Sequence, residues 1–482
     1  MGNMAATKQP KAFYMIFFLE FWERFGFNGF NGILALFFVK SLGFSETMSF
    51  ATFGTFSALV FGLMPIGGYI GDKILGTKRT IVLGAFVLMS GYFFLAFTDA
   101  NTVFYALAVI CVGNGFFKAN PSSLLSNFYA KEDSRLHSAF TMYYMAINIG
   151  SFIAILLLPP IAAHYGWHAA FFISGIGLIF ALLNFLLMRK TVMNVNVNAD
   201  SKKFNVFTLL FIVVGGALVV LLCSYLLIHI SLAHLILWGI CAVVTIMFFK
   251  YTFKEHGIVR RKMLVAFILM LEAVIFFTLY QQMPTSLNFF AIHNVNCNVF
   301  GFHINPQSFQ SLNCFWIIIM SPILAFFYNR FGLKKKDMSI SAKFAFGMTL
   351  CAISFTLLYF ARYYHTSTGL VSPWWLIASY FFQSTGELLI SALGLAMVAQ
   401  LVPNKIVGFI MGMWFLTTAV SGVTGGIVAS LTAPPVGVTE SLQTLGIYTH
   451  VFLEIGIITT VIAIIMWFTY PLLNRYIYAE NK

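Results

Sequence analysis

The first long apolar segment of the chain contains the stretch Phe17-Phe18-Leu19-Glu20-Phe21-Trp22-Glu23-Arg24-Phe25-Gly26. Its three charged residues are spaced i, i+3 and i+4, so all three project from one face of a helix. A charge at the centre of a bilayer costs roughly 2.5–3.5 kcal/mol even on the lenient insertion scale. Such a cluster therefore persists only where it faces a water-filled cavity or other charges. It indicates a site for ions, protons or a charged substrate, and a structural ion pair between helices is the alternative.

The composition indicates a membrane protein. The chain has 482 residues, of which 60% are hydrophobic and 9% are charged. Apolar stretches of spanning length recur from Phe13 onward, which predicts an all-α polytopic membrane protein. We expect no cleavable signal peptide, because the first apolar stretch is too long and lacks a small-residue cleavage site. None of the six cysteines forms a CxxC pair, and we expect no metal and no cofactor.

Hydropathy predicts fourteen transmembrane helices. Their approximate ranges are 13–38, 51–73, 79–98, 102–128, 138–160, 168–188, 206–229, 232–253, 262–291, 308–329, 341–363, 373–400, 404–430 and 447–473.

The basic residues indicate the orientation of these helices. Twenty-four of the 28 lysines and arginines fall on segments that are cytoplasmic if the N-terminus is cytoplasmic. Lys40 and Arg362 fall outside, and Arg24 and Lys118 are intramembrane. This asymmetry follows the positive-inside rule and predicts that both termini are cytoplasmic. Topology then explains the net charge of +13, and no nucleic-acid partner is expected.

The predicted helices divide into two halves of six helices and an inserted pair. The turn Gly71-Asp72-Lys73-Ile74-Leu75-Gly76-Thr77-Lys78-Arg79 has a counterpart at 328–336, another short basic turn that contains glycine. Two related halves with a substrate site between them are typical of major-facilitator-type transporters. We therefore predict an N-terminal six-helix bundle at 1–190, an inserted linker hairpin at 191–260 and a C-terminal six-helix bundle at 261–482.

Two further charged residues lie inside apolar segments of opposite halves. Lys118 follows Gly113-Asn114-Gly115-Phe116-Phe117, and with Arg24 it would form a positive pocket for a carboxylate. A buried ion pair is the alternative for Lys118. Glu387 lies mid-helix and would receive an ammonium group. A cation pocket in one half and an acid in the other suit a zwitterion, such as an amino acid or a short peptide.

Several stretches resemble the signatures of the proton-coupled oligopeptide transporter family, which includes the bacterial dipeptide and tripeptide permeases. The resemblance runs nearly end to end and includes the inserted hairpin. The matching stretches are the ExxERF motif at 20–25, the turn at 67–76, and the segments 140–152, 282–291 and the helix around Glu387.

The resemblance implies a proton-coupled symporter that imports dipeptides and tripeptides by alternating access. Arg24 and Lys118 would receive the peptide carboxylate. Glu20 and Glu23 would carry or relay the proton, with Arg24 as their electrostatic partner. A substrate carboxylate that competes for Arg24 would free an acid to take up a proton, which couples the two fluxes.

The same resemblance implies further substrate-binding positions in both halves. Three would hold the amino terminus of the peptide, namely Asn148, Asn313 and Glu387. Three aromatic residues would line the pockets for the peptide side chains, namely Tyr144, Phe289 and Trp414. Gln282, from the 282–291 motif, would also bind substrate.

The chain departs from the family pattern at several positions. Phe27, Asn28 and Phe61 stand where the family usually has tyrosine, and Gln281 stands where it often has glutamate. Asn28 and Asn31 would supply amide groups in place of the lost phenols, so we expect Asn28 to bind substrate. These changes motivate an alternative function, a related transporter that has shifted to another small zwitterion such as an amino acid or a modified peptide.

A membrane enzyme or sensor is a third interpretation, from a different class. The sequence contains no HExxH motif, no Gly-rich phosphate loop, no evident Ser-His-Asp arrangement and no sizeable soluble domain. We therefore expect a transporter and not an enzyme. We expect it to lie in the cell inner membrane as a multi-pass protein and to function as a monomer.

Overall fold

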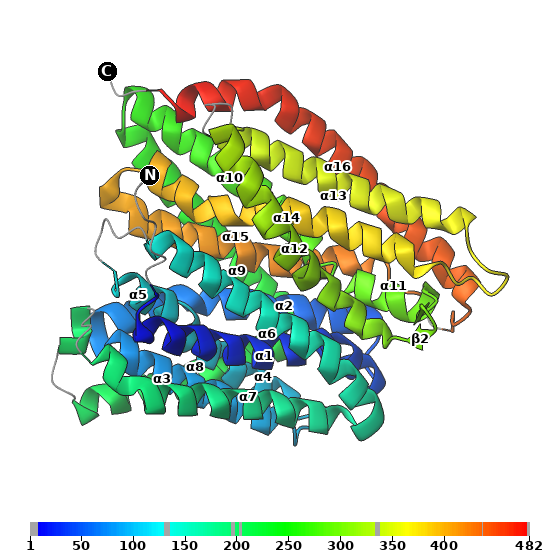
Figure 1. The fold of residues 1–482 in the computed structure, drawn as a ribbon, viewed down its shortest axis with the longest axis horizontal. Helices are drawn as coiled ribbons and strands as arrows, with labels where there is room; N and C mark the ends of the chain where they lie inside the picture. The colour runs from blue at the N-terminus through cyan, green and yellow to red at the C-terminus, as the bar shows by residue number, and fades with distance from the viewer. Residues whose placement is uncertain are drawn as a thin grey trace. The chain divides into compact units, whose positions relative to one another are not determined.

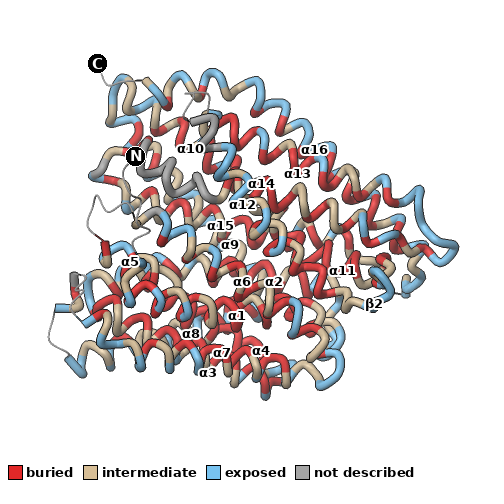
Figure 2. Tube along the Cα trace, viewed as in Figure 1, coloured by how far each residue is buried: buried red, intermediate tan, exposed pale blue. Residues whose placement is uncertain are grey.

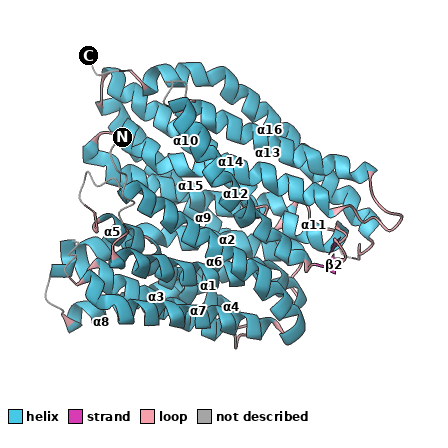
Figure 3. Ribbon diagram, in the orientation of Figure 1, coloured by secondary structure: helices cyan, strands magenta, loops and turns pink. Residues whose placement is uncertain are grey.

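The computed structural model describes residues 8–129, 135–193, 198–201, 205–332, 338–435 and 437–479. Helices joined by short loops make up nearly all of this part of the chain (Figure 3). The described residues include one two-stranded hairpin, formed by β1 (Asn298–Val299) and β2 (Phe302–His303).

The predicted number of spanning helices agrees with the structure. Twelve helical segments in the described ranges are long and apolar enough to cross a membrane. Two more helices, α1 (Lys11–Lys40) and α14 (Pro373–Leu401), have 30 and 29 residues. Both exceed the roughly 20 residues that a span requires. The chain is a multi-pass helical membrane protein.

The helices form two compact units, and the first unit contains residues 1–37 and 59–229. It holds α1 and the second half of α2 (Glu46–Tyr69), which continues into a π-helical turn at Ile70–Leu75. Its other helices are α3 (Thr77–Leu95), α4 (Val103–Lys118), α5 (Asn120–Ser126), α6 (Arg135–Tyr165), α7 (Trp167–Met188) and α8 (Val206–Ile228). Short 3-10 turns follow α7 at Arg189–Val192 and Asn198–Ser201.

Close packing of α4 on α3 determines where the charged end of α4 lies. A side-chain carbon at Gly84 would approach the backbone nitrogen of Phe117 to 2.6 Å, and one at Gly113 would approach that of Leu88 to 2.6 Å. Only glycine permits helices to approach this closely. The two contacts fix the height of α4 along α3, and therefore the position of Lys118 in its last turn.

The fourth predicted helix, 102–128, is two helices in the structure. α4 ends at Lys118, and α5 begins at Asn120 with Pro121 in its first turn. Proline lacks the backbone N–H that a continuous helix needs, so it is favoured at a helix start. Lys118 therefore lies at the C-terminal end of a helix, where the helix dipole favours a cation.

The second unit contains residues 38–58 and 230–482. It includes the first half of α2 together with α14. Its other helices are α9 (Ile230–Lys254), α10 (Gly257–Tyr280), α11 (Ser286–Asn294), α12 (Ser311–Gly332), α13 (Ile340–Phe360), α15 (Val407–Ser430) and α16 (Ser441–Ile477). Short 3-10 turns lie at Pro306–Gln310, Ala361–Tyr363 and Asn404–Ile406. The ninth predicted helix, 262–291, is interrupted between α10 and α11, where Pro284 lies.

Packing within the second unit places apolar side chains between the helices. α13 packs along α16 and also on α14, and α10 packs on α15 and α14. Figure 1 shows α13 and α16 running side by side. In Figure 2 the exposed positions of α16 recur along one edge, while its side toward α13 is buried. A long helix that is apolar on both sides but buried on one is the pattern expected where the other side meets lipid.

The two helices of the predicted hairpin pack on different units. α8 lies on α4 in the first unit, whereas α9 lies on α10 and α15 in the second. The division into 1–190, 191–260 and 261–482 stays a prediction.

Candidate functional site

The charged stretch of α1 forms a bidentate ion pair in the first unit. Arg24 Nε donates to Glu23 Oε2 at 2.6 Å, and Arg24 Nη2 donates to Glu23 Oε1 at 2.5 Å. Glu23 is fully buried and Arg24 is 7% exposed. Both carboxylate oxygens of Glu23 are thereby occupied by one guanidinium, which is the strongest geometry that such a pair can adopt.

Lys118 at the end of α4 completes the cluster with Glu20. Lys118 Nζ donates to Glu20 Oε1 at 2.8 Å, and Arg24 Nε lies 3.9 Å from the same oxygen. Glu20 is also fully buried. The two acids and two cations therefore balance in charge. Arg24 and Lys118 thus lie at the same carboxylate, but both cations already hold carboxylates of the protein, and their binding of a peptide carboxylate stays a prediction.

Aromatic side chains surround these ion pairs. The guanidinium of Arg24 lies 4.7 Å from the ring centre of Phe27, a cation–π contact. The Tyr143 hydroxyl donates to the Glu20 carboxylate, and the Tyr92 hydroxyl is near enough to Glu23 and Arg24 for the charges of both to act on it. Sequence reasoning missed both tyrosines. The pair Tyr143-Tyr144 in the 140–152 motif was a signal for the first, whereas nothing near Tyr92 marked it.

Asn28 and Asn148 belong to the same unit. Asn28 Nδ2 donates to Ser151 Oγ on α6 at 2.5 Å, and Asn148 Nδ2 donates to the carbonyl of Tyr144 at 2.9 Å. Asn148 is 5% exposed, and the side chain of Tyr144 is half-buried. Since Asn148 and Ser151 are three residues apart, one face of α6 carries these polar groups.

In the second unit, Glu387 of α14 and Asn313 of α12 lie together. Asn313 Nδ2 donates to Glu387 Oε2 at 2.8 Å and also contacts Ser384 Oγ at 3.1 Å. Glu387 is 9% exposed and makes no ion pair among the described residues. A buried acid with an amide neighbour and no cation is suited to receive a cationic group from a ligand.

Gln282 lies where the chain leaves α10. It is fully buried, and its Nε2 donates to the carbonyls of Thr278 and Gly425 at 3.0 and 3.1 Å. Its Oε1 accepts from Ser286 Oγ at 2.8 Å. The amide is thus satisfied within the protein, and a role in substrate binding stays a prediction.

Gln281, at the position where the resemblance implies a glutamate, lies beside it. Gln281 Nε2 donates to Ser57 Oγ at 2.9 Å, and both groups are buried. This neutral contact holds the first half of α2 against the end of α10 without any titratable group.

The two aromatic candidates of the second unit pack against other rings. Phe289 is 1% exposed, and its ring centre lies 4.9 Å from that of Phe50 in an edge-on contact. Trp414 is 6% exposed and meets Phe277 edge-on at 6.2 Å. Their predicted roles in side-chain pockets stay predictions.

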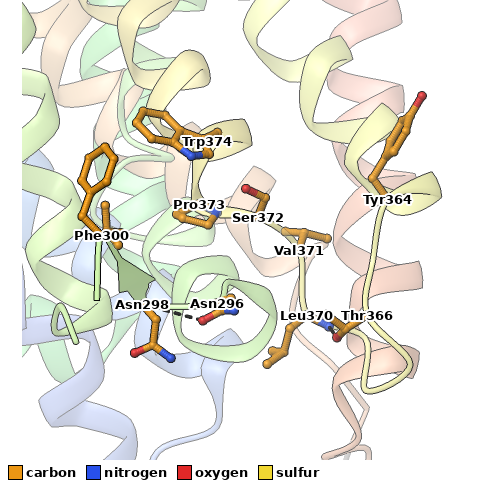
Figure 4. Close-up of a pocket in the computed structure, with 11 residues that line it drawn as sticks. Asn296, Asn298, Phe300, Tyr364, Thr366, Leu370, Val371, Ser372, Pro373 and Trp374 are labelled. Atoms are coloured by element: carbon orange, nitrogen blue, oxygen red, sulfur yellow. Dashed lines mark hydrogen bonds between the residues drawn. The ribbon is translucent and has the colours of Figure 1, made fainter. Parts of the chain in front are cut away.

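A separate pocket of about 330 Å³ lies at the loops that flank α12 and α14. Figure 4 shows Phe300 beside Trp374, with ring centres 5.7 Å apart, and the hydroxyl of Tyr364 pointing away from them. None of its lining residues carries a charge, so it offers no ion-pair partner for the termini of a peptide. Among the described residues, no three His, Cys, Asp or Glu side chains are arranged to hold a metal ion.

Comparison with known proteins identifies the family of the chain. The chain is 52% identical to dipeptide and tripeptide permease B of Photorhabdus asymbiotica, over 100% of this chain and 99% of that one. It is also 52% identical to dipeptide and tripeptide permease A of Salmonella typhimurium, over 98% and 94% of the two chains.

A solved bacterial homologue of the human drug peptide transporters PepT1 and PepT2 has the same fold. It matches with a TM-score of 0.85 and 36% identity, over 96% of this chain and 98% of that one. This match confirms the predicted major facilitator fold. The sequence model of the POT family covers residues 78–445. The predicted resemblance is therefore confirmed, and the chain belongs to the POT family.

Proposed function

We propose that this protein imports dipeptides and tripeptides together with protons. Like its relatives, it is a transport protein and not an enzyme. The observation that carries the proposal is the charge-balanced cluster in which Glu20 and Glu23 occupy Lys118 and Arg24. A peptide carboxylate has the same chemistry as those two side chains and can replace either of them.

Competition for the cations supports proton coupling. When a peptide carboxylate takes Arg24 or Lys118, the displaced glutamate stays in a site that excludes water. A buried charge without a partner is strongly unfavourable, so the freed carboxylate takes up a proton. Peptide binding and proton binding then assist each other, as linkage requires.

The second unit supplies the complementary chemistry. Glu387 would bind the peptide ammonium, with Asn313 and Asn148 as neutral hydrogen-bond partners. The transporter would expose these groups to each side of the inner membrane in turn, with both chain termini in the cytoplasm and the monomer as the working unit.

Purified protein in proteoliposomes tests this function directly. Labelled dialanine should accumulate above its external concentration when an inward proton gradient is imposed, and a protonophore should abolish the accumulation. Uptake that never exceeds equilibration, with or without the gradient, would show that transport is not driven by protons.

A second candidate substrate class has one structural observation in its favour. The ring of Phe27 contacts the guanidinium of Arg24, and it carries no phenol to hydrogen-bond a peptide backbone. This favours a shift toward another small zwitterion. Competition of single amino acids, modified peptides and dipeptides against labelled dialanine separates the two candidates.

Restoring the missing phenols should strengthen peptide binding. Phe61→Tyr, alone and combined with Phe27→Tyr, is expected to lower the dialanine concentration for half-maximal uptake by about tenfold, because a hydrogen bond to a charged group contributes roughly 1.5–3 kcal/mol. Phe97→Tyr is the matched control, because Phe97 is 79% exposed in the turn that follows α3. Unchanged or weaker binding in the restored variants would favour the alternative substrate class.

Glu387→Gln tests the ammonium site. The amide oxygen of glutamine can still accept from Asn313, so folding should be retained. Half-maximal uptake of dipeptides should need about ten- to hundredfold more substrate, and N-acetylated dipeptides should compete equally well against both proteins. Glu454→Gln on the exposed side of α16 is the control. Equal losses for free and acetylated peptides would argue against an ammonium contact.

A further inference from the structure

Two polar side chains of the first unit are buried without a hydrogen-bond partner. The Tyr92 hydroxyl has none, and neither the oxygen nor the nitrogen of the Asn114 amide has one. Tyr92 is fully buried and Asn114 is 1% exposed. Native proteins rarely leave such groups unsatisfied, because each one destabilises the fold. A state in which they do gain partners would explain their presence.

Tyr92 reaches the cluster from α3. Its ring packs on Phe30, with centres 5.0 Å apart, and a side-chain carbon at Gly26 would lie 3.2 Å from the ring. Its hydroxyl is near enough to Glu23 and Arg24 for the charges of both to act on it. The tyrosine therefore lies against α1 at the level of the bidentate pair.

Asn114 reaches the same level from α4. It lies four residues before Lys118, so both side chains share one face of α4. The bond from Lys118 to Glu20 sets the register of α4 against α1. Since the first and fourth spans run in opposite directions, one turn back on α4 corresponds to one turn forward on α1. That turn carries Arg24.

Protonation of Glu23 changes the hydrogen-bond donors and acceptors that the Glu23–Arg24 pair presents to its neighbours. One carboxylate oxygen gains a proton and becomes a donor, and Arg24 loses an anion for two of its N–H groups. The Tyr92 oxygen can accept from the new carboxyl O–H, and the Asn114 oxygen can accept from the guanidinium. In the described part of this unit, the titratable and charged groups that act on Glu23 are Arg24, Tyr92 and Tyr143. Glu20 and Lys118 follow one step further, because Glu20 lies beside Arg24 and Lys118 pairs with Glu20.

We propose that Tyr92 and Asn114 are positioning residues that hold Glu23 and Arg24 while Glu23 carries the transported proton. This inference rests on the proposed proton-coupled function. In the step, one proton binds to Glu23 and the ion pair to Arg24 opens, and no covalent bond changes. The two side chains lack partners in the ion-paired state because their partners arrive with the proton.

Tyr92→Phe is expected to change the pH dependence of uptake without lowering the melting temperature. This variant removes only a hydroxyl that has no partner in the ion-paired state, so its melting temperature should equal or exceed that of the wild type. The protonated state loses a stabilising contact, so a higher proton concentration is needed to reach it. The midpoint of dialanine uptake against external pH should move lower by about one unit.

Tyr105→Phe is the matched control, because Tyr105 is 40% exposed on α4. Asn114→Leu should move the midpoint in the same direction, and Asn114→Ser, which keeps an acceptor oxygen, should restore part of it. Uptake midpoints of Tyr92→Phe and Asn114→Leu equal to wild type would overturn the inference, as would lower melting temperatures with unchanged midpoints. If the wild-type protein itself shows no proton-driven accumulation, the proposed function fails first and this inference fails with it.

Discussion

Glu23→Gln is expected to abolish peptide accumulation driven by a proton gradient, while counterflow exchange of labelled for unlabelled peptide stays partly intact. Glutamine has the shape of glutamate but cannot carry a proton, and its amide oxygen can still accept one hydrogen bond from Arg24. The substrate site is then preserved and the coupling is lost. Accumulation and counterflow are measured on the same proteoliposomes, with and without the gradient.

The control for this variant is Glu440→Gln, which changes an exposed acid just before α16. It should retain full accumulation. If Glu23→Gln still concentrates dialanine with the gradient, the proton is carried elsewhere and the role of Glu23 is wrong. A loss of both accumulation and counterflow would instead assign Glu23 to substrate binding or folding.

Arg24→Ala and Lys118→Ala are expected to reduce the uptake of peptides with a free carboxylate by about a hundredfold or more, since removing one partner of a buried pair costs about 3–5 kcal/mol. C-terminally amidated peptides should lose far less, because they bring no carboxylate to these cations. Uptake is expressed per folded protein, which is measured by size-exclusion chromatography of the detergent-solubilised transporter. Lys40→Ala at the exposed end of α1 is the silent control.

A charge-matched double variant separates binding from folding. In Lys118→Ala, Glu20 stays buried without its 2.8 Å partner, and part of the loss is structural. Adding Glu20→Gln removes the unpaired charge, so the amount of folded protein should recover while the uptake of free peptides does not. Recovery of uptake together with folding would assign Lys118 a structural role only.

Much of the fold was predictable because its signals are local. Length and hydropathy identify spans, since any segment that crosses lipid must satisfy its own backbone hydrogen bonds. Pro121 was a local signal for the helix break after Lys118. The apolar stretch continues across the break, so hydropathy alone predicted one continuous helix. The resemblance to one family was detectable for the same reason, because its motifs are contiguous stretches such as 20–25.

The pairing of charges was harder to predict. The sequence suggested Arg24 as the partner of Glu20 and Glu23, and a buried ion pair as the alternative for Lys118. It did not indicate which acid Lys118 would meet, because Glu20 and Lys118 are 98 residues apart. Tyr92 illustrates the same limit, since a tyrosine in an apolar helix reads as a packing residue until its neighbours are known.

The sequence by itself determined that Glu20, Glu23 and Arg24 share one helix face, because side-chain direction follows from the helical period alone. It also determined the number of spans and the family. Only the tertiary structure decided that Glu23 accepts from Nε and Nη2 of Arg24, that Lys118 pairs with Glu20, and that Tyr92 and Asn114 are left without hydrogen-bond partners. These outcomes depend on how closely α4 can approach α3 and at what height it meets α1. That approach is set by contacts such as Gly84 with Phe117, which no local pattern encodes.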